Sequence, residues 1–182
     1  MNRLFIALPV STEIVDYIDN LLREENSYSK FKWEKKENIH ITLKFLGDTE
    51  QNIIEIIDRL LNNIVLKHNS LKLKLHKLGT FNKYGKPFIL WFNFYNNELM
   101  ENLQQDIENE LFNIGFKKDE REFNPHVTLL RIKNEKDANL VNNYKEINIE
   151  PLEYYATEFY LMKSDLTKNG SVYTKLKTYK LK

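Results

Sequence analysis

Two short segments of the chain place a histidine and a threonine two residues apart. The first reads NIHITL (residues 38–43) and the second reads NPHVTL (residues 124–129). They share the pattern Asn-x-His-[Ile/Val]-Thr-Leu and lie 86 positions apart. With only four histidines in the chain, two His-x-Thr matches are expected by chance on the order of once in sixty sequences. The repeat therefore indicates a shared role for the two segments.

The spacing within each segment has a direct geometric meaning if both segments are β-strands. Side chains two residues apart in a strand point to the same face. His40 would then share a face with Thr42, and His126 would share a face with Thr128. The apolar residues between them would point to the opposite face and become buried. Two such strands brought together would present two imidazoles and two hydroxyls to one cleft.

Two histidines can carry out acid–base chemistry near neutral pH without a metal ion. The ordinary pKa of histidine lies close to neutrality, so one imidazole can accept a proton while the other donates one. The hydroxyls of Thr42 and Thr128 can bind two anionic oxygens of a phosphate group. Neither segment holds a hydroxyl or thiol nucleophile beside an obvious base, so the nucleophile would be water or a substrate hydroxyl. This combination suits a phosphodiester substrate.

Other interpretations of the histidines remain open. A single histidine in a strand is usually a hydrogen-bonded core residue, and His68 and His76 are expected to be structural or solvated. A metal site is disfavoured because threonine is a poor ligand and both segments lack acids. The chain has no cysteine, which excludes disulfides, cysteine-based zinc sites and a thiol nucleophile. We therefore expect neither a metal ion nor another cofactor.

Two basic residues follow the segments and are candidates for binding a phosphate. Strict alternation places Lys44 on the face of His40, although a solvated lysine at the end of a strand is an equally simple interpretation. The same alternation places Arg131 on the face opposite His126. Arg131 would then reach the cleft only if the strand twists or ends before it.

Hydrophobic periodicity predicts the helices and strands that position these residues. Asp48 with Gln51 three residues later resembles a capping box at the start of a helix. Strands are expected at 3–8, 39–46, 71–79, 87–94, 126–132, 152–163 and 172–181. Helices are expected at 12–25, 50–66 and 99–114, with a short one at 135–142. Mixed helices and strands with short connections indicate an α+β fold with antiparallel sheets.

Composition narrows the class of protein further. The chain has 182 residues, of which 42% are hydrophobic and 29% are charged, and this balance is typical of a globular protein. A net charge of +1 gives no bulk attraction to nucleic acid. Residues 163–182 nevertheless contain six lysines and one acid, which predicts a solubilised edge strand or one wall of an anion-binding cleft. No signal peptide or membrane-spanning stretch is visible, so we expect a soluble, cytoplasmic protein without a membrane partner.

The chain resembles a known family in four places: RLFIALPV, NIHITLKFLG, FNPHVTLLRIK and the closing FYLMKSDLTKNGSVYTKLKTYKL. These segments are similar to those of the two-histidine (2H) phosphoesterases, in the branch of RNA 2′,3′-cyclic phosphodiesterases also called 2′-5′ RNA ligases. The resemblance implies a bilobal, pseudo-twofold α+β fold, with antiparallel sheets, helices on the outer faces and a central cleft. It also implies that residues 1–182 form one domain of two intertwined lobes, which contribute the motifs 40–43 and 126–129.

The resemblance further implies hydrolysis of a 2′,3′-cyclic phosphate to a 2′-phosphomonoester without a metal. His126 would activate water and His40 would protonate the departing 3′ oxygen, while Thr42 and Thr128 bind the non-bridging oxygens. Arg131 and Lys44 would be further substrate-binding residues. The implied partners are RNA 3′ ends, including tRNA, or small cyclic nucleotides, and the implied state is a monomer.

Three alternatives share these sequence features. A 2H phosphodiesterase could act on a 2′-5′ linked oligonucleotide or on an ADP-ribose cyclic phosphate. The same chemistry run in reverse would join RNA ends through a 2′-5′ linkage. A noncatalytic module that binds RNA ends would retain the cleft but need only one intact histidine.

Overall fold

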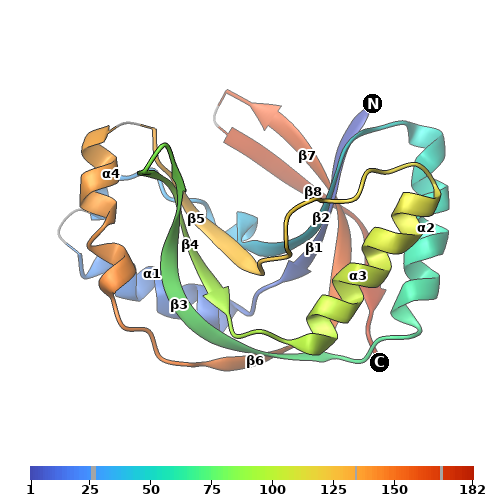
Figure 1. Ribbon diagram of the computed structural model, residues 1–182, viewed down its shortest axis with the longest axis horizontal. Coiled ribbons are helices and arrows are strands. Elements are labelled where there is room, and N and C mark those ends of the chain that lie inside the picture. Colours follow the sequence, from blue (N-terminus) through green and yellow to red (C-terminus); the bar gives the residue numbers. More distant parts are fainter. Residues whose placement is uncertain (26–27, 134, 169) are drawn as a thin grey trace.

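The computed structural model describes residues 1–25, 28–133, 135–168 and 170–182 (Figure 1). Within these residues the chain forms two antiparallel four-stranded sheets, with strand orders β2-β1-β7-β8 and β5-β4-β3-β6. The strands are β1 (Asn2–Pro9), β2 (His40–Thr49), β3 (Leu71–Lys83), β4 (Lys86–Phe94), β5 (His126–Arg131), β6 (Glu153–Ala156), β7 (Glu158–Thr167) and β8 (Gly170–Lys180). The α-helices are α1 (Thr12–Arg23), α2 (Gln51–Val65), α3 (Glu98–Asn113) and α4 (Glu135–Val141). The expected α+β fold with antiparallel sheets is confirmed.

The predicted strand 152–163 is two strands that belong to different sheets. β6 pairs with β3 in the second sheet, whereas β7 pairs with β1 in the first. The chain therefore passes between the sheets at Thr157, whose carbonyl accepts a hydrogen bond from the backbone of Leu181. Thr157 and Glu158 interrupt the apolar pattern at this point, and the buried positions shift from Tyr154 and Ala156 to Phe159 and Leu161, so the alternation changes phase where the chain changes sheet.

The capping box expected at Asp48 and Gln51 is not formed. β2 continues through Asp48 to Thr49, and Gly47 keeps the strand paired by adopting a positive φ of 71°. Glu50 is the N-cap residue of α2 and makes no side-chain capping bond. A glycine followed by an aspartate suggests a turn, but here the glycine accommodates an irregularity within a long strand.

The helices cover the sheets in two groups (Figure 1). α2 and α3 lie side by side at one end of the molecule, and α1 and α4 lie at the other. In α1, the apolar side chains of Ile14, Ile18 and Leu22 recur at helical spacing and are buried in the core. The side chain of Ser11 accepts a hydrogen bond from the backbone of Ile14 at 3.4 Å and caps the helix start. Among the described residues, no helix combines the length and hydropathy needed to cross a membrane.

Three of the six lysines in residues 163–182 contact an acid or an aromatic ring in or beside the last two strands. β8 is the edge of the first sheet. Lys177 pairs with Asp58 at 3.1 Å, Lys163 pairs with Asp165 at 2.9 Å, and the ammonium of Lys175 lies 3.5 Å from the ring centroid of Tyr160. The expected turn between the two last strands includes Asn169, which lies outside the described residues.

Candidate active site

The two His-x-Thr segments form edge strands that lie next to each other. β2 is the edge of the first sheet and begins at His40, and β5 is the edge of the second sheet and begins at His126. Both strands run through the middle of the molecule in Figure 1 and are in contact. The fold therefore brings together two motifs that are far apart in the sequence, as the sequence analysis predicts.

A β-bulge follows the threonine of the first motif. Thr42 lies opposite Ala7 of β1, whereas Lys44 lies opposite Ile6, so Leu43 is an extra residue in β2. Residues opposite each other in an antiparallel pair share a face. Because a bulge shifts the alternation by one residue, Lys44 shares the face of Ile6 rather than that of Thr42.

Lys44 is consequently buried, on the face of β2 opposite Thr42. Its side chain is 4% exposed, and its ammonium donates hydrogen bonds to the carboxylate of Glu108 at 2.7 Å and to the carbonyl of Lys117 at 2.9 Å. The prediction that Lys44 shares the face of His40 is wrong, because it assumed unbroken alternation. Lys44 instead joins β2 to α3 and to the segment that precedes the second motif.

The second motif contains a bulge at the same place. Thr128 lies opposite Trp91 and Leu130 lies opposite Leu90, which leaves Leu129 as the extra residue in β5. Arg131 then lies opposite Ile89, two residues from Trp91 in β4. Arg131 therefore shares the face of Thr128 while it is still part of the strand. Strict alternation allowed Arg131 to reach the cleft only if the strand twisted or ended before it. The bulge moves Arg131 to the face of Thr128 instead.

Glu34 contacts both the bulge at Leu129 and the guanidinium of Arg131. The backbone N–H of Glu34 donates to the carbonyl of Leu129 at 2.8 Å, and its carboxylate lies 3.5 Å from Nε of Arg131. Sequence reasoning missed Glu34, because no local pattern relates it to a bulge some 95 positions later. The Arg131 charge lowers the pKa of both His40 and His126, so it acts on both imidazoles.

The shared asparagine of the motifs fixes the tautomer of each histidine. Nδ1 of His40 lies 2.7 Å from the carbonyl of Asn38, and Nδ1 of His126 lies 2.8 Å from the carbonyl of Asn124. A carbonyl can only accept a hydrogen bond, so Nδ1 carries a hydrogen in both rings. Each neutral imidazole is left with a lone pair on Nε2, and this nitrogen can take up or return a proton.

Both imidazoles are mainly neutral at pH 7, because their pKa values lie below the ordinary value of 6.5. The pKa of His40 is lowered from 6.5 to about 4, mainly by burial; the Asn38 carbonyl opposes this shift, and positive charge on Arg131 and His126 adds to it. Burial also lowers the pKa of His126, with a smaller contribution from Arg131. The ring of His40 packs against Phe5 and Tyr173, at centroid distances of 5.0 and 5.3 Å.

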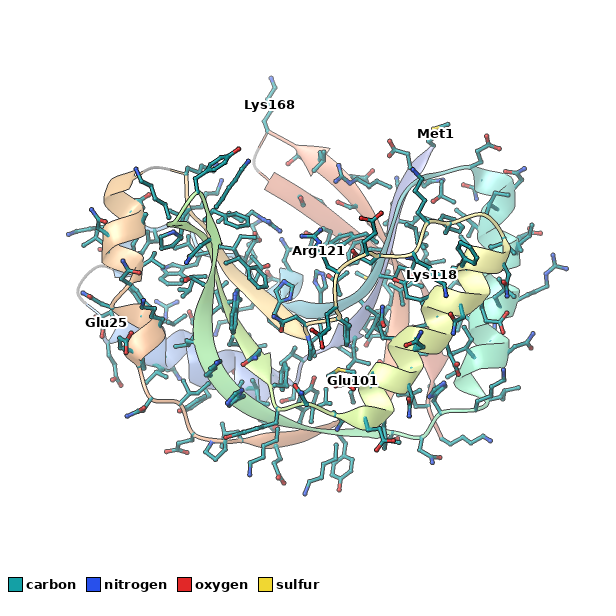
Figure 2. All side chains as sticks on the ribbon, viewed as in Figure 1. Met1, Glu25, Glu101, Lys118, Arg121 and Lys168 are labelled. Atoms are coloured by element: carbon teal, nitrogen blue, oxygen red, sulfur yellow. The ribbon has the colours of Figure 1, made fainter. Side chains whose placement is uncertain are left out.

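A pocket of about 330 Å³ opens beside the motifs. Thr42 and His126 line it together with Arg121, which lies near the centre of the view in Figure 2. Its aromatic lining residues are Phe45, Phe81, Phe88 and Phe123. Phe45 is 68% exposed and Phe88 is 38% exposed. Such exposed aromatic faces can stack against a planar ring of a ligand.

The geometry can be compared with known proteins. The family model described as LigT like Phosphoesterase matches residues 8–91 and 96–173. The chain belongs to this family of LigT-like phosphoesterases. The resemblance expected from the paired motifs is thereby confirmed for nearly the whole chain.

Several known proteins match over more than nine-tenths of their length. An RNA 2′,3′-cyclic phosphodiesterase of Methanocaldococcus jannaschii is 35% identical, and the match covers 97% of this chain and 99% of the relative. A protein of the same name from Thermotoga maritima is 30% identical, with 94% and 91% covered. The structure of Escherichia coli LigT complexed with 3′-AMP has a TM-score of 0.80 at 24% identity, with 99% and 98% of the two chains covered, and therefore supports the fold alone.

The donor set of this LigT-like phosphoesterase does not form an evident metal site. Among the residues that the structure describes, no three histidine, cysteine, aspartate or glutamate side chains are grouped so that they could hold a metal ion. The side chains that share the site with the two imidazoles are the hydroxyls of Thr42 and Thr128 and the guanidinium of Arg131. This set is chemically suited to an anion.

Proposed function

We propose that this LigT-like phosphoesterase hydrolyses the 2′,3′-cyclic phosphate of an RNA 3′ end or of a nucleotide to a 2′-phosphomonoester. The observation that carries the proposal is the pair of neutral imidazoles, His40 and His126, on adjacent edge strands. Nδ1 of each imidazole is hydrogen-bonded to a backbone carbonyl, and the positive charge of Arg131 lowers the pKa of both. The names of the relatives, RNA 2′,3′-cyclic phosphodiesterase, support the same activity.

In the proposed reaction the two histidines act on opposite sides of the phosphorus atom. Nε2 of His126 accepts a proton from water as the water oxygen forms a bond to phosphorus. The bond between phosphorus and the 3′ oxygen breaks, and Nε2–H of His40 donates a proton to that oxygen. One proton is taken up and one is released, so the next turnover requires only proton exchange with solvent.

The remaining side chains stabilise the phosphate during the reaction. The hydroxyls of Thr42 and Thr128 donate hydrogen bonds to its non-bridging oxygens, and the guanidinium of Arg131 balances its charge. His40 needs a proton to act as the acid, although burial is the main cause that lowers its pKa to about 4. The bound phosphate supplies the opposite charge that raises this pKa, so the acid is formed mainly in the substrate complex.

The scheme uses no metal ion and no other cofactor. We propose that the protein acts in the cytoplasm as a monomer, with the two sheets as the cores of two lobes of one domain. RNA 3′ ends, such as those of cleaved tRNA, would be its partners. Because proton transfer by the histidines is reversible, the site can also join RNA ends through a 2′-5′ linkage, but hydrolysis dominates in water.

The function is tested by incubating an RNA that ends in a 2′,3′-cyclic phosphate with the protein, with and without EDTA, and identifying the product. A 2′-phosphate formed equally in both reactions is the expected result. Loss of activity with EDTA would indicate a metal-dependent reaction. Turnover only of a 2′-5′ linked oligonucleotide or an ADP-ribose cyclic phosphate would reassign the substrate, and binding without turnover would indicate a noncatalytic module.

A further inference from the structure

A basic groove of about 470 Å³ adjoins the candidate site at Asn38 and Arg131. It lies between residues 30–35, the end of β5, the start of α4 and the tip of the β7–β8 hairpin. Its basic lining residues are Lys30, Lys32, Lys35, Arg131, Lys133 and Lys168, and its acidic ones are Glu34 and Asp137. The groove therefore carries a local excess of positive charge in a chain whose net charge is only +1.

Most of these cations are available to a ligand. Lys30, Lys35, Lys133 and Lys168 are exposed, and the structure pairs none of the four with a carboxylate of a described residue. By contrast, Lys163 and Lys177 have carboxylate partners. Of the six lysines in residues 163–182, Lys168 lines the groove, and Figure 2 shows it at the tip of the hairpin.

The groove is continuous with the residues that act on the histidines. Asn38 fixes the tautomer of His40, Arg131 lowers the pKa of both imidazoles, and both residues line the groove. A ligand whose terminal phosphate lies at the imidazoles can therefore extend directly into it. The phenylalanine-lined pocket offers no such path for a polyanion, because its charged residues are balanced: Lys44 and Arg121 against Asp119 and Glu122.

We propose that this groove binds the phosphodiester backbone of the RNA next to its cyclic phosphate end. The inference rests on the proposed function and narrows its substrate to RNA ends in preference to cyclic mononucleotides. Backbone phosphates attract lysines and arginines without regard to sequence. A single-stranded end lying along the groove would gain this attraction, whereas a mononucleotide has no further backbone phosphate to place there.

The test compares two triple variants that remove equal charge at different places. Lys30→Gln, Lys35→Gln and Lys133→Gln neutralise the groove. Lys67→Gln, Lys180→Gln and Lys182→Gln are the matched control, since these lysines are exposed and none of them lines the groove. They lie near the C-terminus, where the backbone N–H of Lys182 donates to the carbonyl of His68. Each is assayed on 2′,3′-cyclic AMP and on a short oligoribonucleotide that ends in a 2′,3′-cyclic phosphate.

The groove variant should lose at least about tenfold in kcat/KM on the oligoribonucleotide and none on 2′,3′-cyclic AMP. The slope of log(kcat/KM) against log salt on the oligoribonucleotide should become shallower by about 2, because about 0.7 counterion is released per phosphate contact with single strands. Equal losses on both substrates, no loss on the oligoribonucleotide, or equal losses in the two triple variants would overturn the proposal.

A binding measurement separates this proposal from the proposed function. Fluorescence anisotropy of a labelled oligoribonucleotide with a 3′-terminal phosphate needs no turnover. Weaker binding by the groove variant, with normal binding by the control variant, supports the groove even if the wild-type protein hydrolyses nothing, a result that would remove the proposed function alone. Equal binding by all three proteins would contradict the groove.

Discussion

Leu43 and Leu129 occupy equivalent positions, each as the extra residue of a β-bulge directly after a His-x-Thr motif. The bulges have the same effect on the faces of both strands. The residue after each leucine, Lys44 or Leu130, is buried. The next residue returns to the face of the threonine, and it is Phe45 in one strand and Arg131 in the other. The two halves of the site thus share a backbone plan but present an aromatic ring on one side and a cation on the other.

This relationship predicts the effect of removing the guanidinium. Arg131→Gln should raise the pKa of both His40 and His126, because the positive charge of Arg131 lowers both. It should also reduce kcat/KM about 10- to 100-fold through lost stabilisation of the phosphate. The pKa values are measured by NMR titration of the imidazoles, with Lys133→Gln as the control cation. Unchanged pKa values in Arg131→Gln would mean that the guanidinium does not act on the histidines.

Removing one partner of the buried ion pair between Lys44 and Glu108 should lower the free energy of unfolding more than replacing both. Glu108→Gln leaves the ammonium of Lys44 without a carboxylate, and the loss of one partner of a buried pair costs about 3 kcal/mol or more. Lys44→Met with Glu108→Leu should recover most of that free energy of unfolding. As a control, Glu153→Gln breaks the exposed pair with Lys72 and should leave denaturant unfolding nearly unchanged. A double variant as unstable as Glu108→Gln would contradict this account.

Acid should destabilise the protein partly through His40. Its pKa is 6.5 when unfolded and about 4 when folded, so the unfolded chain binds the proton more tightly. The stabilisation is fully present above pH 6.5 and is lost as the pH falls toward 4, by up to about 3 kcal/mol. His40→Asn removes this titration, so the free energy of unfolding of the wild type should fall more steeply than that of the variant. If the free energy of unfolding of the wild type and of His40→Asn changes with pH in parallel, the pKa of His40 is not lowered by folding.

The sequence predicts the parts of this structure that depend on local periodicity. The helices and strands follow from apolar spacing, and the pairing of His40 with His126 follows from a repeated motif. Bulges at Leu43 and Leu129 depend on which residues lie across the sheet, so strict alternation misplaced Lys44 and left Arg131 undecided. The change of sheet at Thr157 is marked in the sequence only by a shift in the apolar alternation, which does not say which strand each half pairs with. The contact of Glu34 with the β5 bulge depends likewise on tertiary pairing and becomes visible only when the partner strands are known.

The central claim is that His40 and His126 together hydrolyse a 2′,3′-cyclic phosphate. It is tested most directly by following the conversion of an RNA 2′,3′-cyclic phosphate end to a 2′-phosphate by the wild type, His40→Ala and His126→Ala, with circular dichroism as a check on folding. Each folded variant should be slower by about 10²–10⁴ in kcat. Near-normal conversion by either folded variant would contradict the two-histidine mechanism.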